Sequence, residues 1–241
     1  MNDIKAVIFD IDGTLYEPRC FPLRLIASDP LHIGMLARER KCRKILKGKE
    51  FACADDYYNA LFNLMGKGSP SASARCREWF SRSYMPSQVR IIEKHFPKRP
   101  LLRELITGLK SEGYLVAVLS DYAFAREKLQ ACGLGDISFD GVWEAPEIGG
   151  LKPCRQTFLN VCKALNVRPE DAVMIGDRAD TDGGAADAGL KFIHLVKEEN
   201  QHGTGSAPGK EMTWNQILDM FNVGNSRIPH IRPLSHSRRE E

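Results

Sequence analysis

Two acidic side chains follow a short apolar segment near the start of the chain. Asp10 and Asp12 come directly after Ala-Val-Ile-Phe, at positions i and i+2. Because side chains alternate along an extended chain, both carboxylates point to the same side. At the carboxyl end of a buried strand, that side opens into the crevice where α/β folds bind ligands. Two buried acids repel each other unless a proton or cation lies between them, so the pair predicts a site for a hard divalent ion such as Mg²⁺.

The residues after this pair suit a sharp exit from the strand. Gly13 allows the chain to turn, and we expect Thr14 to hydrogen-bond within that turn. A surface turn capped by aspartate is the alternative interpretation, and the apolar segment before Asp10 argues against it.

A second acidic cluster, Gly-Asp-Arg-Ala-Asp-Thr-Asp, follows the apolar segment Ala-Val-Met-Ile and contains Asp177, Asp180 and Asp182. Asp182 alone would be explained as the cap of a following helix. Two acidic clusters at the ends of two parallel strands are explained more simply by one shared metal site.

Two further residues have weaker signals when taken singly. Ser120 ends the apolar segment Tyr-Leu-Val-Ala-Val-Leu, where a hydroxyl and backbone N–H groups form an anion site, although a helix-capping serine is the simpler interpretation. Lys152 follows Gly-Gly-Leu and precedes Pro153, so its ammonium could neutralise a phosphate and an acid together. A surface lysine is the alternative.

The elements that must position these residues form an α/β pattern. Apolar runs of strand length alternate with helical patterns, which predicts an open parallel sheet of Rossmann-like type. The expected strands are Ala6–Phe9, Tyr114–Leu119, Phe139–Trp143, Ala172–Ile175 and Phe192–Val196. The expected helices of this core are a stripe over Leu101–Leu109 ended by Gly113, the segment Ala123–Cys132, and a helix from Pro153 to about Leu165.

The long stretch from Leu15 to about Arg99 has helical rather than strand periodicity. Its apolar residues recur in steps of three and four, and Ser69-Pro70 predicts a helix start, with Trp79 and Phe80 facing inward. The inward residues expected in its first part are Leu31, Met35, Cys42, Ile45 and Leu46; those in its second are Phe51, Ala54, Tyr58, Leu61, Phe62 and Met65. We expect an all-helical domain inserted after the first strand.

The order Asp-x-Asp-Gly-Thr, Ser, Lys, Gly-Asp-x-x-x-x-Asp resembles the haloacid dehalogenase superfamily, most of whose members are phosphatases. The resemblance covers about residues 3–20 and 100–197. It implies a core formed by residues 1–16 and 97–200. It also implies a cap of residues 17–96, because the interval from Ser120 to Lys152 is too short to hold a cap. This is the arrangement of the helical-cap subgroup.

The resemblance also implies a role for each motif residue in a Mg²⁺-dependent phosphatase. Asp10 would be the nucleophile that forms an aspartyl-phosphate, and Asp12 the general acid and base. Mg²⁺ would be held by Asp10, the carbonyl oxygen of Asp12, and Asp177, with Asp182 supporting the metal's water shell or Lys152. Ser120, the N–H of Asp121 and Lys152 would bind the phosphate of a small phosphorylated metabolite.

Other activities of the superfamily stay open to different degrees. Asp12 argues against halide displacement. A halide leaves without being protonated, so that reaction needs no second acid, whereas an alkoxide leaving group does. A phosphomutase, a phosphonatase or a non-enzymatic binding protein on the same fold are the alternatives, although four converging carboxylates serve no evident purpose in a pure binding module. Two residues depart from the family pattern: Asp121 stands where Asn is frequent, and Cys154 where an acid is common.

Composition sets the remaining expectations. The 241 residues carry a formal net charge of +3, and basic residues are concentrated in the run Arg38–Lys49. We interpret this run as the solvated face of a cap helix rather than as a surface that steers the substrate. Neither nucleic-acid nor membrane partners are expected. Seven cysteines without a Cys-x-x-Cys pair, and the lack of a secretory signal, favour the reducing cytoplasm.

The C-terminal region is expected to contribute little to the site. Residues 201–210, QHGTGSAPGK, have the composition of a flexible linker and depart from the phosphate-loop pattern at Thr204 and Glu211. A short helix is expected over Met212–Phe221, followed by a polar tail, Asn222–Glu241, which has little apolar surface to bury and is expected to be flexible. The oligomeric state is left open.

Overall fold

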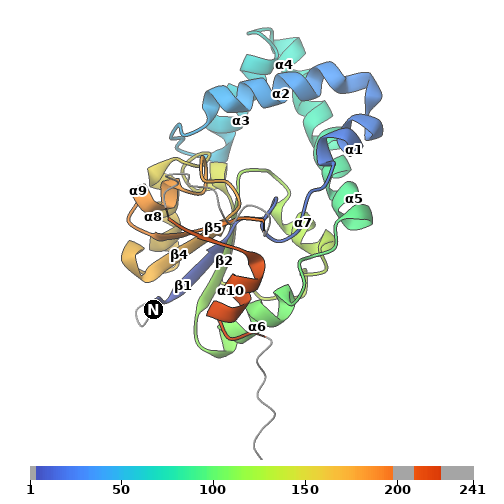
Figure 1. Ribbon diagram of the computed structural model, residues 1–241. Helices are drawn as coiled ribbons and strands as arrows, with labels where there is room; N and C mark the ends of the chain where they lie inside the picture. The colour runs from blue at the N-terminus through green and yellow to red at the C-terminus, as the bar shows by residue number, and fades with distance from the viewer. Residues whose placement is uncertain (1–3, 198–208, 224–241) are drawn as a thin grey trace, which may run out of the picture.

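The computed structural model describes residues 4–197 and 209–223, and within them six parallel strands form one sheet (Figure 1). The strand order is β3-β2-β1-β4-β5-β6. The bounds are β1 Ala6–Phe9, β2 Leu115–Ser120, β3 Gly141–Glu144, β4 Ala172–Gly176, β5 Lys191–Leu195 and β6 Lys210–Met212. The expected open parallel α/β sheet is confirmed, and β1, with the first acidic pair at its end, lies between β2 and β4.

Alternation along the strands divides the core into two layers. In β1, Val7 and Phe9 pack on one side of the sheet and Ala6 and Ile8 on the other, all fully buried. A strand covered on both faces has no polar position, which is why these segments are continuous apolar runs.

Five helices cover the two faces of the sheet. Leu105, Leu129 and Ile217 represent α6, α7 and α10 in the cluster on one face. Phe158 and Ala185 represent α8 and α9 in the cluster on the other. The helices are α6 Leu102–Ser111, α7 Ala125–Ala131, α8 Arg155–Ala164, α9 Gly184–Asp187 and α10 Trp214–Met220, and short 3₁₀ turns span Ala145–Glu147 and Pro169–Asp171.

Helix boundaries in the core differ from the sequence-based expectation at several positions. Pro153 does not open α8, because the helix begins two residues later, at Arg155. Leu101 is not part of the apolar stripe of α6: it precedes the helix in the left-handed conformation and is 43% exposed. Gly113 does follow the helix with a positive φ of 88°, as expected.

The elements between β1 and the helix α6 that precedes β2 are all helices or helical turns, and they lie beyond the carboxyl ends of the strands (Figure 1). We name residues 21–95 the cap. Its elements are α1 Phe21–Ser28, a 3₁₀ turn Pro30–His32, α2 Ile33–Leu46, α3 Ala54–Met65, α4 Pro70–Trp79, a π-helical turn Phe80–Tyr84 and α5 Met85–His95. As expected, a helix starts at Pro70, where the Ser69 hydroxyl accepts a hydrogen bond from the Ala72 N–H (3.4 Å).

Two of the cap residues that were predicted to face inward are exposed in the structure. Trp79, Phe80, Cys42 and Leu46 are buried, as expected. Leu31 and Ile45 are instead 91% and 48% exposed. The apolar stripe assumed a single helix, whereas the 3₁₀ turn before α2 changes the helical phase, which removes Leu31 from the packed face.

The C-terminal region contains a strand that sequence analysis missed. Lys210–Met212 is β6, which pairs with β5 at the sheet edge, so Lys210 is not part of a linker and Met212 does not start the helix. The helix begins after Thr213, whose hydroxyl accepts from the Gln216 N–H while the Gln216 side chain accepts from the Thr213 N–H. Residues 201–208 of the expected linker and 224–241 of the expected tail lie outside the described residues.

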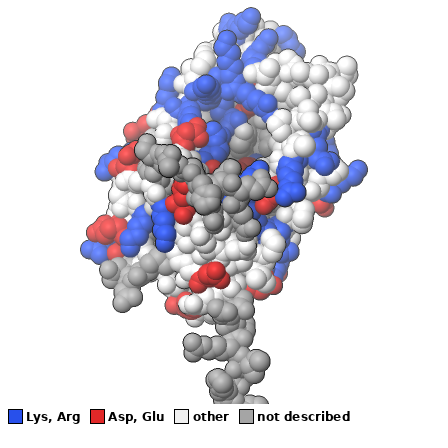
Figure 2. Space-filling view, in the orientation of Figure 1, with Lys and Arg blue, Asp and Glu red and all other residues white. Residues whose placement is uncertain are grey.

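No helix in the described part of the chain is both long enough and apolar enough to cross a membrane. Lys and Arg side chains gather over the cap in the face shown in Figure 2, where the run Arg38–Lys49 occupies α2 and the turn after it.

Candidate active site

The loop after β1 is shaped by a glycine that no other residue could replace. Asp10 donates its backbone N–H to Ile175 of β4 (3.0 Å), which continues the sheet pairing up to the first aspartate. Gly13 then turns with φ +104°, and a Cβ there would lie 2.1 Å from Oδ2 of Asp177. The turn therefore needs glycine both for its backbone conformation and for the approach of the second acidic cluster.

Thr14 does not hydrogen-bond the turn through its side chain as expected. Its hydroxyl is fully buried and has no hydrogen-bond partner among the described residues, while its backbone N–H donates to Ile11 (3.2 Å).

Three of the predicted acids come together at the carboxyl ends of β1 and β4. Asp10, Asp177 and Asp182 each present a carboxylate oxygen within 4.8 Å of the others. Asp10 and Asp182 are buried, at 7% and 1% exposure. Gly176 permits this approach, because a Cβ at that position would lie 2.2 Å from Oδ2 of Asp182.

Lys152 neutralises part of this charge. Its Nζ lies 2.7 Å from Asp10 Oδ1 and 2.5 Å from Asp182 Oδ1, and also donates to the carbonyl of Leu119 (3.2 Å). All three donors of the ammonium are thus used. Burial opposes the charged form, but Asp10 and Asp182 raise the pKa of Lys152 well above its ordinary value.

The remaining negative charge exceeds what one ammonium offsets. Burial, followed by repulsion from the other carboxylates, raises the pKa of Asp10 to about 7 even though Lys152 acts against it. Burial and the Asp10 charge raise the pKa of Asp177 to about 7 as well. The site therefore carries a strong electrostatic preference for an added cation or protons.

The donor set fits a hard divalent cation. Oδ1 of Asp177 is buried without a hydrogen-bond partner in the described chain. Asp177 is one of the three residues whose carboxylates converge. Carboxylate oxygens are the ligands that Mg²⁺ favours.

The two residues that end β2 lie beside this centre. Ser120 is fully buried, and its Oγ accepts from the Tyr122 N–H (3.2 Å), which holds the turn after the strand. Oδ1 of Asp121 accepts from the backbone N–H of Lys152 (2.8 Å). The unusual acid at position 121 is therefore directed toward the Lys152 backbone, where it ties two site loops together.

Asp12 is held by two residues that sequence analysis did not identify. Lys128 of α7 contacts both carboxylate oxygens of Asp12, and the Tyr16 hydroxyl donates to Oδ1. Lys128 and Tyr16 are both fully buried. The sequence signal for Lys128 is its position: it lies three residues after Ala125 and next to Leu129, on the face of α7 that packs inward.

The cap contributes a charged contact to the core at the turn after β2. The Arg43 guanidinium lies 3.9 Å from the centre of the Tyr122 ring, hydrogen-bonds the Tyr122 hydroxyl, and pairs with Glu39, which is fully buried. The interpretation of the basic run as a solvated face is therefore wrong for Arg43. Lys47 reaches the core as well, where it pairs with Asp180, the acid of the second cluster that points away from the centre.

Backbone contacts join the same part of the cap to the loop that carries Lys152. The N–H of Phe51 donates to Gly149 (2.7 Å) and the N–H of Gly48 donates to Leu151 (3.3 Å). The cap is thus fixed against the core directly beside the acidic centre.

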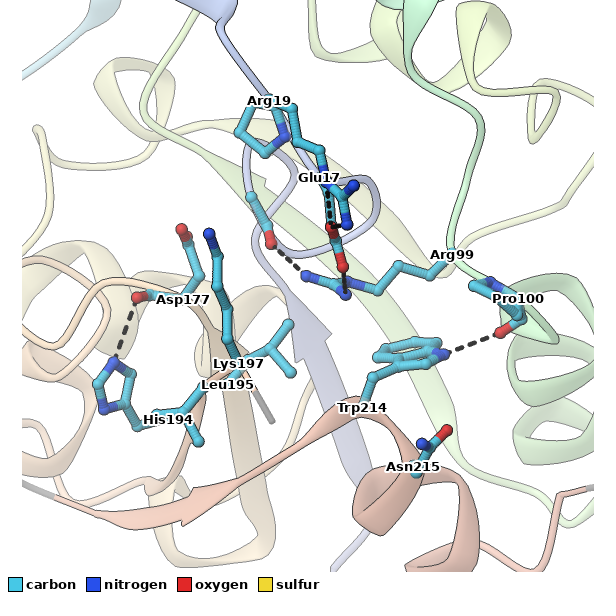
Figure 3. A pocket seen from close by; sticks show the side chains of 13 residues that line it. Glu17, Arg19, Arg99, Pro100, Asp177, His194, Leu195, Lys197, Trp214 and Asn215 are labelled. Atoms are coloured by element: carbon cyan, nitrogen blue, oxygen red, sulfur yellow. Dashed lines mark hydrogen bonds and ion pairs between the residues drawn. The ribbon is translucent and has the colours of Figure 1, made fainter. Parts of the chain in front are cut away.

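A pocket of about 890 Å³ borders the centre on the side of Gly13 and Asp177 (Figure 3). Arg99 crosses it and donates to the carbonyls of Gly13 (2.9 Å) and Thr14 (2.7 Å) and to the Glu17 carboxylate (3.0 Å). Arg99 therefore anchors the loop after β1 from the segment by which the chain returns from the cap.

Comparison with known proteins agrees with this geometry. Residues 4–189 match the model of the haloacid dehalogenase-like hydrolases. N-acylneuraminate-9-phosphatase of Homo sapiens is 36% identical over 233 residues, which cover 91% of this chain and 93% of that protein. Glyceraldehyde 3-phosphate phosphatase of Pyrococcus furiosus is 28% identical over 207 residues, covering 80% of this chain and 81% of the relative.

Among solved structures, a HAD phosphatase from Thermococcus onnurineus shares the fold, with a TM-score of 0.62 at 22% identity over 90% of this chain and 97% of the other. The phosphatase names of the two relatives support the expected class, a phosphoric monoester hydrolase. The match over most of the core and cap, with the sequence motifs and their convergence in space, shows that the chain belongs to the haloacid dehalogenase-like hydrolases.

Proposed function

We propose that this protein is a Mg²⁺-dependent phosphatase that hydrolyses a small phosphomonoester through an aspartyl-phosphate on Asp10. The observation that carries the proposal is the buried centre in which Asp10, Asp177 and Asp182 converge while Lys152 bridges two of them. A buried carboxylate beside a fixed ammonium and a cation site is suited to attack an anionic phosphate, because the surrounding positive charge offsets the repulsion.

Asp10, Asp177 and the carbonyl oxygen of Asp12 would hold Mg²⁺, with Asp182 supporting Lys152. When bound, the ion supplies charge stabilisation for phosphoryl transfer. These aspartates lie at the carboxyl ends of parallel strands, in the crevice that α/β folds use for ligands.

The chain's own residues account for the chemistry of both half-reactions. An oxygen of Asp10 attacks phosphorus while Lys152 holds the other side of that carboxylate at Oδ1. Asp12 gives a proton to the departing alkoxide and then takes one from the water that hydrolyses the aspartyl-phosphate. Ser120 and the N–H of Asp121, in the turn after β2, bind the phosphate oxygens.

We propose that residues 17–96 act as a cap that excludes bulk water and selects the leaving group over a core of residues 1–16 and 97–200. The contacts of Arg43 with Tyr122 and of Phe51 with Gly149 support such a closed arrangement. A closed site favours small substrates. The relatives are named for the phosphates of glyceraldehyde and N-acylneuraminate, so a small sugar phosphate is the proposed substrate class.

We further propose a cytoplasmic location. All seven cysteines are free, and five of them are buried, which agrees with a reducing compartment.

The test is phosphate release from a panel of sugar phosphates, phosphoglycolate, nucleoside monophosphates and an aryl phosphate, with Mg²⁺ and with excess chelator. We expect metal-dependent turnover that is fastest for a sugar phosphate. Turnover that persists in chelator would contradict the proposed cofactor. No turnover of any phosphomonoester would favour the phosphomutase or phosphonatase alternatives, which bisphosphate and phosphonate substrates would then distinguish.

A further inference from the structure

The carboxylate of Asp12 is surrounded by donors in a way that the proposed reaction leaves unexplained. Nζ of Lys128 lies 2.9 Å from Oδ1 and 2.7 Å from Oδ2, and the Tyr16 hydroxyl donates to Oδ1. Among the described residues, Asp12 is the one carboxylate with which Lys128 forms an ion pair.

The cost of burying Lys128 indicates that this contact is specific. A fully buried ammonium is strongly destabilising unless it is paired and hydrogen-bonded. Two of the contacts of Lys128 are to Asp12, and its Nζ also lies 4.6 Å from the centre of the Tyr122 ring, in cation–π range. The buried charge is thus placed where it acts on Asp12.

The two oxygens of Asp12 are not equivalent. Each carboxylate oxygen has two lone pairs. Oδ1 accepts from both Lys128 and Tyr16, which uses both of its lone pairs, whereas Oδ2 accepts only from Lys128 among the described residues and keeps one lone pair. The Asp12 side chain is 21% exposed while both of its donors are fully buried, so the donors approach from the interior and part of the Asp12 side chain stays accessible to solvent.

We propose that Lys128 and Tyr16 are positioning residues that fix the carboxylate of Asp12 so that Oδ2 is the atom that transfers the proton. This rests on the proposed acid and base role of Asp12. Lys128 orients the carboxylate through both oxygens, and Tyr16 occupies the remaining lone pair of Oδ1. The Tyr16 ring is stacked on Phe96, which directly follows the cap, with 5.7 Å between the ring centres.

The test compares kcat/KM for an alkyl and an aryl phosphomonoester, because kcat/KM reports the step that expels the leaving group. An alkoxide needs a proton to leave, whereas an activated phenoxide does not. We expect Lys128→Met to lower kcat/KM for the alkyl substrate at least about tenfold more than for the aryl substrate, since a positioned general acid contributes about 10²- to 10⁴-fold. Tyr16→Phe, which keeps the stacked ring, should show the same bias at a smaller size.

Three controls separate the possible failures. Lys110→Met removes a lysine–aspartate pair with Asp140 near the amino end of β2, and it should leave both substrates unaffected. If Asp12→Asn shows no leaving-group bias, the acid role in the proposed function is wrong. If Asp12→Asn shows the bias and Lys128→Met lowers both substrates equally or neither, the positioning role is wrong.

Two further results complete the test. In the double variant of Asp12→Asn and Lys128→Met, the alkyl substrate should lose little more than in Asp12→Asn alone, because residues that act on one proton transfer are not additive. If Lys128→Met does not fold, Tyr16→Phe decides, and an unbiased or absent effect there overturns the proposal.

Discussion

At the residue scale, the acidic centre should make the metal-free protein sensitive to pH. Asp10 and Asp177 have pKa values of about 7 in the fold, against an ordinary value of 3.8, because burial and mutual repulsion disfavour their charges. The folded state binds these protons more tightly than the unfolded chain. Their contribution to stability is therefore present below about pH 4 and is lost as pH rises toward 7.

Thermal unfolding between pH 4 and 8, with chelator and with Mg²⁺, measures this effect. We expect Mg²⁺ to raise the unfolding temperature much more at pH 8 than at pH 5, because protons compete with the ion for the same oxygens. Asp177→Asn should reduce both the pH dependence and the response to Mg²⁺. A response to Mg²⁺ that is equal at both pH values, or unchanged in the variant, would contradict this account of the centre.

The sequence was most informative about residues that follow apolar strands. Asp10, Asp177 and Asp182 could be placed near one another because parallel strands end at one edge of the sheet. The ion pair of Lys128 with Asp12 spans 116 residues and depends on how α7 packs, so no local pattern could reveal it. The hydroxyl of Thr14 was assigned to the turn, yet its hydrogen bond is absent from the described structure.

At the element scale, the loop after β1 depends on one arginine. Arg99 satisfies the carbonyls of Gly13 and Thr14 together with the Glu17 carboxylate. Replacing it by methionine leaves partly buried acceptors without donors, for which we expect a loss of about 1–3 kcal/mol in the free energy of unfolding. The loop carries Asp10 and Asp12, so kcat should fall as well.

Chemical denaturation of Arg99→Met beside Arg103→Met checks this expectation. Arg103 forms an exposed pair with Asp136, so its removal should leave the denaturation midpoint and kcat unchanged. Equal effects of the two variants would mean that the contacts of Arg99 do not hold the loop.

Element boundaries were predicted less well than element types. The core strands were found because their apolar runs are continuous, but β6 has only three residues, two of them charged, and it forms through pairing with β5 rather than through an apolar pattern. Pro153 is typical of a first helical turn, but it lies before α8, which begins at Arg155.

At the scale of the whole molecule, Arg43 of α2 joins an ion pair within the cap to a contact with Tyr122 of the core. The side chains of Arg43 and Glu39 are 16% and 1% exposed, and Arg43 also contacts Tyr122. Arg43→Met leaves the Glu39 charge buried and unpaired, which should cost about 3–5 kcal/mol in the free energy of unfolding. Adding Glu39→Gln should recover much of this loss, because the amide needs no counter-charge.

Arg40→Met is the matched control on the same helix, since Arg40 is exposed. It should change stability little. If Arg43→Met is no more destabilising than Arg40→Met, the contacts of Arg43 with Glu39 and Tyr122 do not stabilise the protein. The sequence could not distinguish the two arginines, because the partner of Arg43 lies 79 residues away in the core.

The central claim is that Asp10 carries the phosphoryl group, and the most direct measurement is acid quenching during turnover followed by mass analysis of the peptide that contains Asp10. The account predicts that this peptide gains the mass of one phosphoryl group in the presence of substrate and Mg²⁺, that hydroxylamine removes it, and that Asp10→Asn prevents both the adduct and turnover. In Asp12→Asn, hydrolysis of the aspartyl-phosphate should be slow, so turnover by this variant without a detectable adduct would contradict the claim. Turnover that survives in Asp10→Asn would contradict it as well.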